Sequence, residues 1–292
     1  MTPRASTAVR VFLEVVDIAA VPRPAVEWLT DISIAQGWLS SRAEAREWAE
    51  RVELRFLDAL RLEHSELTKL GRFAPFAFNS SSGYMLQGCA FIEPRDSEEV
   101  KEAKTRRARF SDYVRALQLL GPRDFEALCA GVLELVGVGR PRLTPMSGDE
   151  GIDFYGQLRL EDRIFPHDIY PTIQKQLTVW MIGQAKRYEA TRVSTPDIRE
   201  LVGSIQLARS RAYADGPEKY ADLQVRLCDP VFYLFFTTGQ LSADSWRLLE
   251  RSGVVAMDGQ MLASFLADRE IGIASGEFDD AKFQEWVEGH RI

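Results

Sequence analysis

Three residues in the middle of the sequence have side chains suited to holding a metal ion beside a reacting water. Gln184 stands two residues before Lys186, and Asp153 lies earlier in the chain. An acidic side chain and a second oxygen ligand can bind a hard cation such as Mg²⁺, which prefers carboxylate and carbonyl oxygens. A neighbouring lysine can help to generate hydroxide or offset charge on transition-state oxygens. The pattern predicts metal-assisted hydrolysis.

The segment Val179–Tyr188 is expected to form a β-strand that positions two of these residues. Side chains alternate between the two faces of a strand. One face would therefore carry Trp180, Ile182, Gln184 and Lys186. Asp153 stands at the start of a shorter expected strand, and a hairpin between the two strands would bring its carboxylate alongside Gln184.

Several short motifs resemble the Mrr-type restriction endonuclease domain, a member of the PD-(D/E)xK nuclease superfamily. The first three are Glu126 within an Asp-Phe-Glu-Ala-Leu helix, Gly151-Ile-Asp153, and Gln184-Ala-Lys186-Arg-Tyr. The similarity continues in Ile198–Gly203, Phe236–Ser242 and Val254–Leu262. Together the motifs cover roughly residues 120–267, in the order that the family shows.

The resemblance implies a role for each matching residue. Asp153 would be the principal metal ligand, and Gln184 would take the place of the usual acidic ligand. The carbonyl of Ala185 would complete the protein's share of the ligands, Lys186 would be the catalytic lysine, and Glu126 would be a helix carboxylate facing the site. The implied cofactor is Mg²⁺, with Mn²⁺ as a substitute. The implied activity is DNA endonuclease cleavage in restriction or antiphage defence.

Plainer roles exist for some of these carboxylates. Asp153 could cap a turn, and Glu126 is favoured in a first helical turn by the helix dipole alone. Asp149 and Glu150 read more readily as loop carboxylates than as metal ligands. Two other functions stay open: a catalytically silent nuclease fold that binds DNA or protein, and a structure-specific repair nuclease.

Other chemistries lack the necessary residues. The chain contains three histidines, and they are isolated from one another at His64, His167 and His290. The sequence has no GxxxxGK[ST] phosphate loop and no GxSxG nucleophile motif. If cleavage requires ATP hydrolysis, another chain must supply the ATPase.

The order of expected elements predicts an α/β fold with two domains. From Phe125 onward helices and strands alternate, as in a layered α/β structure. We therefore expect a restriction-endonuclease-like mixed central sheet, flanked by helices, in a nuclease domain of residues 111–292. Residues 1–110 would form an additional α+β domain that recognises DNA or a partner protein. The segments Glu161–Asp168 and Arg211–Cys228 look like insertions.

Within the first 110 residues, local patterns predict individual elements. The apolar, β-branched run Ala8–Val16 predicts a strand. Helices are expected between residues 25 and 70, with Ser41 or Ser40 as an N-cap and Glu44 placed to close a capping box. A second strand is expected over Tyr84–Ile92, and a charged helix over 97–120.

Composition and charge set further limits. Apolar residues make up 46% of the 292, and no apolar run is long enough to cross a membrane. The N-terminus lacks a signal-peptide pattern. Three widely spaced cysteines form no CxxC pair and fit a reducing cytoplasm. The formal charge of −7 is unfavourable for DNA binding. A locally basic groove is therefore required. Self-association stays open.

Overall fold

The computed structural model describes most of the chain. The described residues are 4–145, 151–158, 177–188, 192–193, 196, 198–199, 203 and 223–291. Contacts between Cα atoms divide the chain into two compact units, Met1–Ser111 and Asp112–Ile292. Each unit has its own sheet, so each is described by itself. No helix among the described residues is long and apolar enough to cross a membrane.

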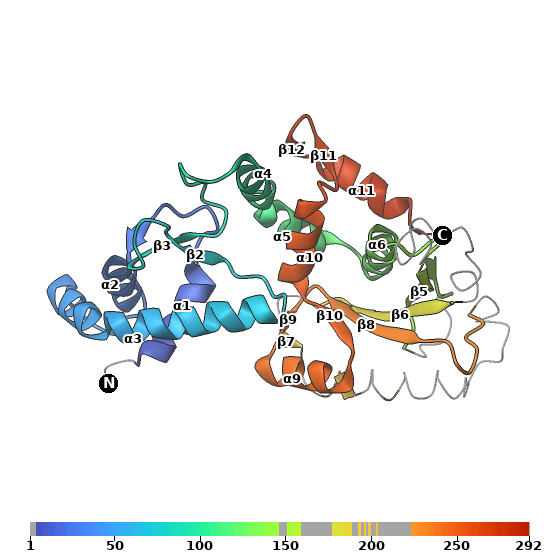
Figure 1. The fold of residues 1–292 in the computed structure, drawn as a ribbon, viewed down its shortest axis with the longest axis horizontal. Coiled ribbons are helices and arrows are strands. Elements are labelled where there is room, and N and C mark those ends of the chain that lie inside the picture. Colours follow the sequence, from blue (N-terminus) through green and yellow to red (C-terminus); the bar gives the residue numbers. More distant parts are fainter. Residues whose placement is uncertain are drawn as a thin grey trace. The chain divides into compact units, whose positions relative to one another are not determined.

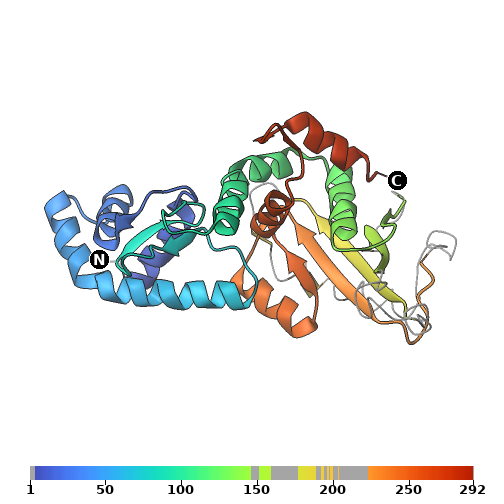
Figure 2. The same ribbon diagram turned by 45° about the horizontal axis from the view of Figure 1, so that its top comes forward.

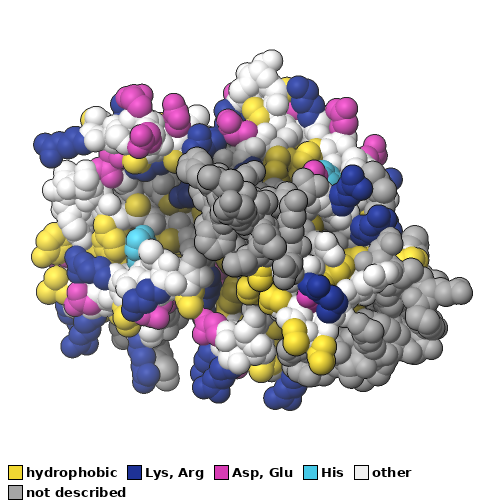
Figure 3. Space-filling model, turned by 45° about the vertical axis from the view of Figure 1, so that its right-hand side comes forward, with side chains coloured by type: hydrophobic (Ala, Val, Ile, Leu, Met, Phe, Trp, Pro, Cys, Tyr) yellow, Lys and Arg dark blue, Asp and Glu magenta, His cyan; other side chains and the backbone are white. Residues whose placement is uncertain are grey.

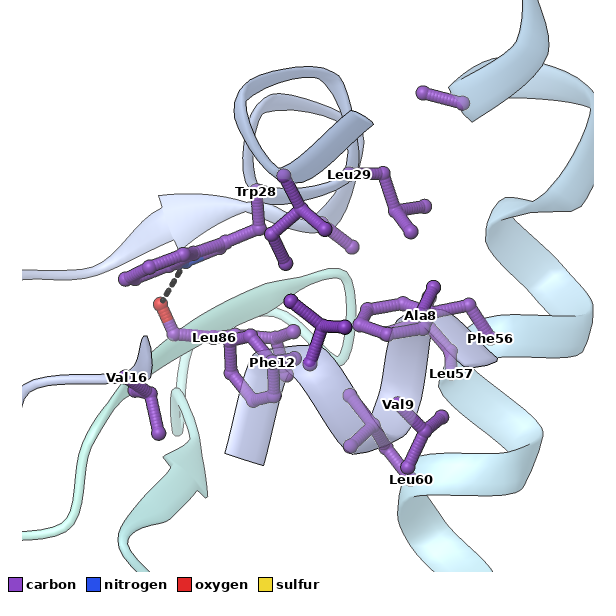
Figure 4. Packing of buried hydrophobic residues seen from close by; sticks show 14 of the residues in the cluster. Ala8, Val9, Phe12, Val16, Trp28, Leu29, Phe56, Leu57, Leu60 and Leu86 are labelled. Carbon is purple, nitrogen blue, oxygen red and sulfur yellow. Dashed lines mark hydrogen bonds between the residues drawn. The ribbon is translucent and has the colours of Figure 1, made fainter. Parts of the chain in front are cut away.

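The first unit packs helices against a small antiparallel sheet with the strand order β1-β3-β2. Its elements are α1 (Ala5–Val15), β1 (Arg23–Pro24), α2 (Ala25–Ala35), α3 (Arg42–Lys69), β2 (Phe76–Phe78), β3 (Met85–Gly88) and α4 (Glu98–Arg107). Phe12 lies at the centre of the core (Figure 4). Its ring makes edge contacts with Trp28, Phe56 and Phe76 at centroid distances of 5.2, 5.8 and 5.5 Å.

The predicted strand over Ala8–Val16 is wrong, because this segment is helix α1. Val9, Phe12 and Val16 are spaced by three and four residues, which places them on one helical face. That face is buried against α2 and α3. Tertiary packing therefore outweighs the strand preference of the valines, as it often does.

Two other predictions for this region need correction. The charged helix expected over 97–120 is two helices, α4 and α5 (Phe110–Leu119). The break comes where an apolar stripe begins: no residue of α4 is buried, whereas Phe110, Tyr113 and Leu117 are. The strand expected over Tyr84–Ile92 pairs only over β3. The N-cap prediction is confirmed, because the N–H of Glu44 donates to Ser41 Oγ at 3.2 Å.

The second unit is built on a mixed sheet, five-stranded in the part that the structure describes, with the order β10-β8-β6-β5-β4. Strands β6, β8 and β10 run parallel, and β4, β5 and β6 run antiparallel. Figures 1 and 2 show α6 and α10 on one side of this sheet and α9 on the other. The predicted fold class, a mixed α/β sheet flanked by helices beside a smaller α+β region, is confirmed.

The bounds of the second unit's elements follow from local signals as well as from packing. Pro122 is the first residue of α6, where its missing N–H has no partner to lose. Asp258 and Asp279 cap α10 and α11 through their carboxylates. The elements are α6 (Pro122–Leu135), β4 (Arg142–Leu143), β5 (Phe154–Leu158), β6 (Val179–Lys186), β7 (Arg192–Val193), β8 (Val231–Thr237), β9 (Gln240–Leu241), α9 (Ala243–Ser252), β10 (Val255–Met257), α10 (Gly259–Asp268), β11 (Ile273–Ala274), β12 (Glu277–Phe278) and α11 (Asp280–Glu288).

Helix α11 packs against α6 at Gly131. A Cβ atom at this glycine would lie 2.5 Å from Trp286 Cη2. The contact is flanked by hydrogen bonds from Arg291 Nε to Asp124 (2.7 Å) and between His290 Nε2 and Glu134 (2.8 Å). Helix α6 is thus held by α11 as well as by strands β5 and β6.

Gly131→Ala should destabilise the protein although alanine normally favours a helix. The added methyl must displace the Trp286 ring, and overpacking of this kind costs about 1–3 kcal/mol. Gly289→Ala is the matched control, since its Cβ would approach nothing closer than 3.4 Å. Denaturant unfolding of both variants measures the difference. An unchanged or increased stability of Gly131→Ala would contradict the packing described here.

Candidate active site

Asp153 lies at the start of β5, directly beside the last residues of β6. The expected antiparallel hairpin is confirmed, with Phe154 paired to Gly183 at its end. The N–H of Asp153 donates to the Gly183 carbonyl at 3.0 Å. Its carboxylate Oδ2 accepts the N–H of Ala185 at 2.7 Å. Both bonds fix Asp153 against the stretch that contains Gln184.

Gln184 is buried, and its amide oxygen has no donor among the described residues. The residue is 3% exposed, and Oε1 has no hydrogen-bond partner among the residues that the structure describes. A buried acceptor without a donor typically costs about 1–3 kcal/mol. Gln184 follows Trp180 and Ile182 on one face of β6, and those two residues belong to a buried apolar cluster with Tyr155. The oxygen is therefore kept away from water by its surroundings.

Lys186 is the last residue of β6 and pairs in register with Thr237 of β8. The strand predicted over Val179–Tyr188 is thus present, as Val179–Lys186. Strand alternation places Lys186 on the same face as Gln184. Lys186 is half-buried, and no ion pair joins it to another described residue.

Ala185 contributes backbone groups at the point where the β5 ladder stops. Its N–H donates to the Asp153 carboxylate. The last register pair between β5 and β6 is Phe154 with Gly183, so Ala185 lies beyond the paired part of the two strands. In a strand the N–H and C=O of one residue point to the same edge. The Ala185 carbonyl therefore points to the edge where Asp153 lies.

Glu126 approaches this hairpin from α6, which packs against both β5 and β6. Its carboxylate accepts a bond from Arg123 Nη1 at 2.7 Å. The same nitrogen donates to the Thr144 carbonyl at 2.9 Å. Thr144 in turn donates its N–H to the carbonyl of Asp153 at 3.0 Å. A continuous set of bonds thus links Glu126 to the Asp153 hairpin.

The Cys129 thiol lies on α6, one turn after Glu126. This thiol is fully buried. Burial raises its pKa well above the usual value, and the negative charges of Asp153 and Glu126 raise it further.

The oxygen atoms at this point fit a hard divalent cation. A carboxylate, a buried amide oxygen and a backbone carbonyl are the donor types that Mg²⁺ takes in proteins. Oxygen donors of these types suit a hard cation better than a metal that prefers thiolate or imidazole ligands. Within the described ranges, no three His, Cys, Asp or Glu side chains gather as metal ligands.

Other residues that the sequence singled out have structural contacts or fall outside the description. Asp149, Glu150 and the Glu161–Asp168 segment lie outside the described residues. Arg187 donates to the Gln118 carbonyl at 3.1 Å. The N–H of Tyr188 donates to Thr238 Oγ1 at 2.9 Å. These two residues therefore anchor the end of β6 to the surrounding fold.

Sequence reasoning did not find Arg123, Thr144 or Cys129. Arg123 stands three residues before Glu126, a spacing at which side chains on a helix meet, so the pair was detectable. Cys129 has the same spacing on the other side of Glu126. Thr144 gives no sequence signal, because its role depends on how β4 is placed beside β5.

The face drawn in Figure 3 bears on the basic groove that the net charge requires. On the face drawn in Figure 3, Lys and Arg side chains are interspersed with Asp and Glu. The expectation of a local basic surface beside the site thus stays a prediction.

Comparison with known proteins supports a nuclease relationship for part of the chain. Residues 117–214 match a family model of the Mrr catalytic type, described as "Restriction endonuclease". No curated protein matches the sequence. The match ends at residue 214, so the motifs expected as far as residue 267 extend beyond it.

Solved structures of restriction endonucleases also match. The MspJI restriction endonuclease in complex with a 27-mer oligonucleotide gives a TM-score of 0.41 at 18% identity, covering 68% of this chain and 40% of that one. The DNA modification-dependent restriction endonuclease AspBHI gives 0.39 at 18% identity, covering 72% and 46%. FokI bound to DNA gives 0.33 at 10% identity, covering 90% and 45%.

The chain spans less than half the length of these solved structures. The family model includes Glu126, Asp153, Gln184, Ala185 and Lys186. The segment from residue 117 to residue 214 is similar to the restriction endonuclease domain of the Mrr type.

Proposed function

We propose that the protein is a Mg²⁺-dependent endonuclease that hydrolyses phosphodiester bonds of DNA in restriction or antiphage defence. The observation that carries this proposal is the buried Gln184 Oε1, which has no hydrogen-bond partner among the described residues, on the residue next to the Ala185 that donates to the Asp153 carboxylate. Mg²⁺, or Mn²⁺ in its place, would be held by Asp153, Gln184 and the Ala185 carbonyl.

The energetics of Gln184 support a ligand role. An apolar side chain of similar size would avoid the cost of a buried oxygen without a donor. A glutamine at this position is therefore unfavourable for the fold unless something else binds the oxygen. Because glutamine is neutral, it attracts a cation less strongly than glutamate would, and the site depends more heavily on the Asp153 charge.

Each of the protein's own site residues has a proposed role. When bound, a divalent cation polarises the scissile phosphate and makes water more acidic. Asp153 is held in place by the Ala185 N–H, so its carboxylate needs little reorganisation. Lys186 would place its ammonium against the attacking water or a phosphate oxygen and offset developing negative charge. Glu126 would face the same site from α6.

The remaining assignments concern partners and location. Residues 1–110 would recognise DNA or a partner protein, and residues 111–292 would hold the nuclease activity. The three cysteines are free in the structure, which suits a cytoplasmic protein.

Lys186→Ala should lower the cleavage rate by about 10²–10⁴-fold, the usual effect of losing a positioned proton-transfer group. Asp153→Ala should be at least as damaging, because the metal would be lost. Lys186→Arg should not restore the rate, since guanidinium is larger and stays protonated. The assay is cleavage of methylated and unmethylated plasmid with Mg²⁺, Mn²⁺ or EDTA.

The matched control is Lys282→Ala, which removes an exposed ammonium from α11. Circular dichroism confirms folding of each variant. A folded Lys186→Ala protein that cleaves at the wild-type rate would overturn the mechanism. DNA binding by the wild type without cleavage under any of these conditions would instead indicate a silent binding module.

Gln184→Met should separate stability from activity. Methionine fills a similar volume without an oxygen, so the unfolding free energy in EDTA should stay equal or rise, by up to about 1–3 kcal/mol. Cleavage and the extra stability conferred by Mg²⁺ should both be lost. The measurement is denaturant unfolding with EDTA or Mg²⁺, beside the plasmid assay.

Gln157→Met, at an exposed position on neighbouring β5, is the matched control and should cleave normally. The ligand role of Gln184 fails if Gln184→Met is less stable than the wild type in EDTA and retains Mg²⁺-dependent cleavage.

A further inference from the structure

The Arg123 side chain joins the first turn of α6 to the end of β4. One nitrogen, Nη1, donates to Glu126 Oε2 at 2.7 Å and to the Thr144 carbonyl at 2.9 Å. A guanidinium Nη atom carries two hydrogens, so each bond has its own. The guanidinium is therefore anchored to the backbone by one bond while it holds the Glu126 carboxylate with the other.

Thr144 carries this connection onward to Asp153. It is 6% exposed. Its N–H donates to the Asp153 carbonyl at 3.0 Å, and its hydroxyl donates to the Ile152 carbonyl at 2.6 Å. The residue bonded to Arg123 is thus itself bonded to the peptide carbonyls on both sides of Asp153. A movement of Arg123 would change the position of Glu126 relative to Asp153.

The electrostatics of the site give Arg123 a second task. Arg123 pairs with Glu126 at side-chain exposures of 32% and 23%. Its positive charge therefore lies beside the Glu126 carboxylate at a partly buried position.

The Arg123–Glu126 pair differs from a solvent-exposed ion pair on helix α9. Arg247 pairs with Asp244 at the same three-residue spacing on α9, but these side chains are 68% and 71% exposed. Exposed pairs of this kind contribute little to stability. Arg123 differs because its second bond leaves the helix and reaches the strand hairpin.

We propose that Arg123 is a positioning residue, which holds Glu126 at the distance from Asp153 that the metal site needs. The inference rests on the proposed nuclease function and goes beyond the residues of the family motif. Arg123 acts through Glu126, so its removal should affect metal affinity and turnover and leave DNA affinity unchanged.

The test compares Arg123→Met, Arg123→Lys, Glu126→Ala, the double variant Arg123→Met with Glu126→Ala, and the control Arg247→Met. Three quantities are measured: kcat and KM for plasmid cleavage in Mg²⁺, the affinity of the DNA-free protein for Mn²⁺ by calorimetry, and the melting temperature. Loss of an outer partner that supports a metal site typically lowers activity or metal affinity about 10–100-fold. Arg123→Met should fall in that range with KM unchanged, and Arg123→Lys should recover part of the loss.

The double variant decides whether Arg123 works through Glu126. In a double-mutant cycle, residues that act together give non-additive effects. The double variant should be no worse than Glu126→Ala alone, and Arg247→Met should match the wild type. An equal loss from Arg123→Met with or without Glu126 would overturn the proposal. So would wild-type kcat and Mn²⁺ affinity in Arg123→Met.

Failure of the underlying function would give a different result. A wild-type protein that binds Mn²⁺ but cleaves no DNA would contradict the proposed activity, and the Mn²⁺ affinities would then decide the role of Arg123. A wild-type protein that binds no Mn²⁺ would overturn both proposals.

Discussion

The hydrogen bond from the Ala185 N–H to the Asp153 carboxylate ties the start of β5 to the end of β6, and the arrangement of the site depends on it. The Ala185 N–H can make this bond because the pairing of β5 with β6 ends at Phe154 and Gly183, two residues before Ala185. The bond also fixes the Asp153 carboxylate on the residue that follows Gln184, whose buried Oε1 has no hydrogen-bond partner among the described residues. The proposed metal ligands therefore come from adjacent ends of two paired strands.

The surrounding fold keeps these groups in place from the side of α6. Arg123 joins Glu126 to the β4–β5 hairpin, and α11 packs its Trp286 ring on Gly131 at the middle of the same helix. Beyond Lys186, the paired hydrogen bonds between Tyr188 and Thr238 fix the end of β6 to the end of β8. A site that needs groups from a helix and two strands thus relies on bonds between elements more than on any single element.

Local patterns predicted the parts that depend on neighbours in sequence. The alternation in β6 and the hairpin to Asp153 were predicted correctly, since both follow from strand geometry. The N-terminal strand was not, because the valines of Ala8–Val16 favour strands locally while Phe12 packs among Trp28, Phe56 and Phe76 from distant segments. The Thr144 link was missed for the same reason, as it exists only once β4 lies beside β5. The buried state of Gln184 Oε1 likewise follows from tertiary packing.

The most direct test of the metal site is a crystal structure of the wild-type protein grown with Mn²⁺, using anomalous scattering to locate the ion. The account predicts an anomalous peak bonded to the Asp153 carboxylate, Gln184 Oε1 and the Ala185 carbonyl. A structure with no ion at this position, in which a protein donor satisfies Gln184 Oε1, would contradict it.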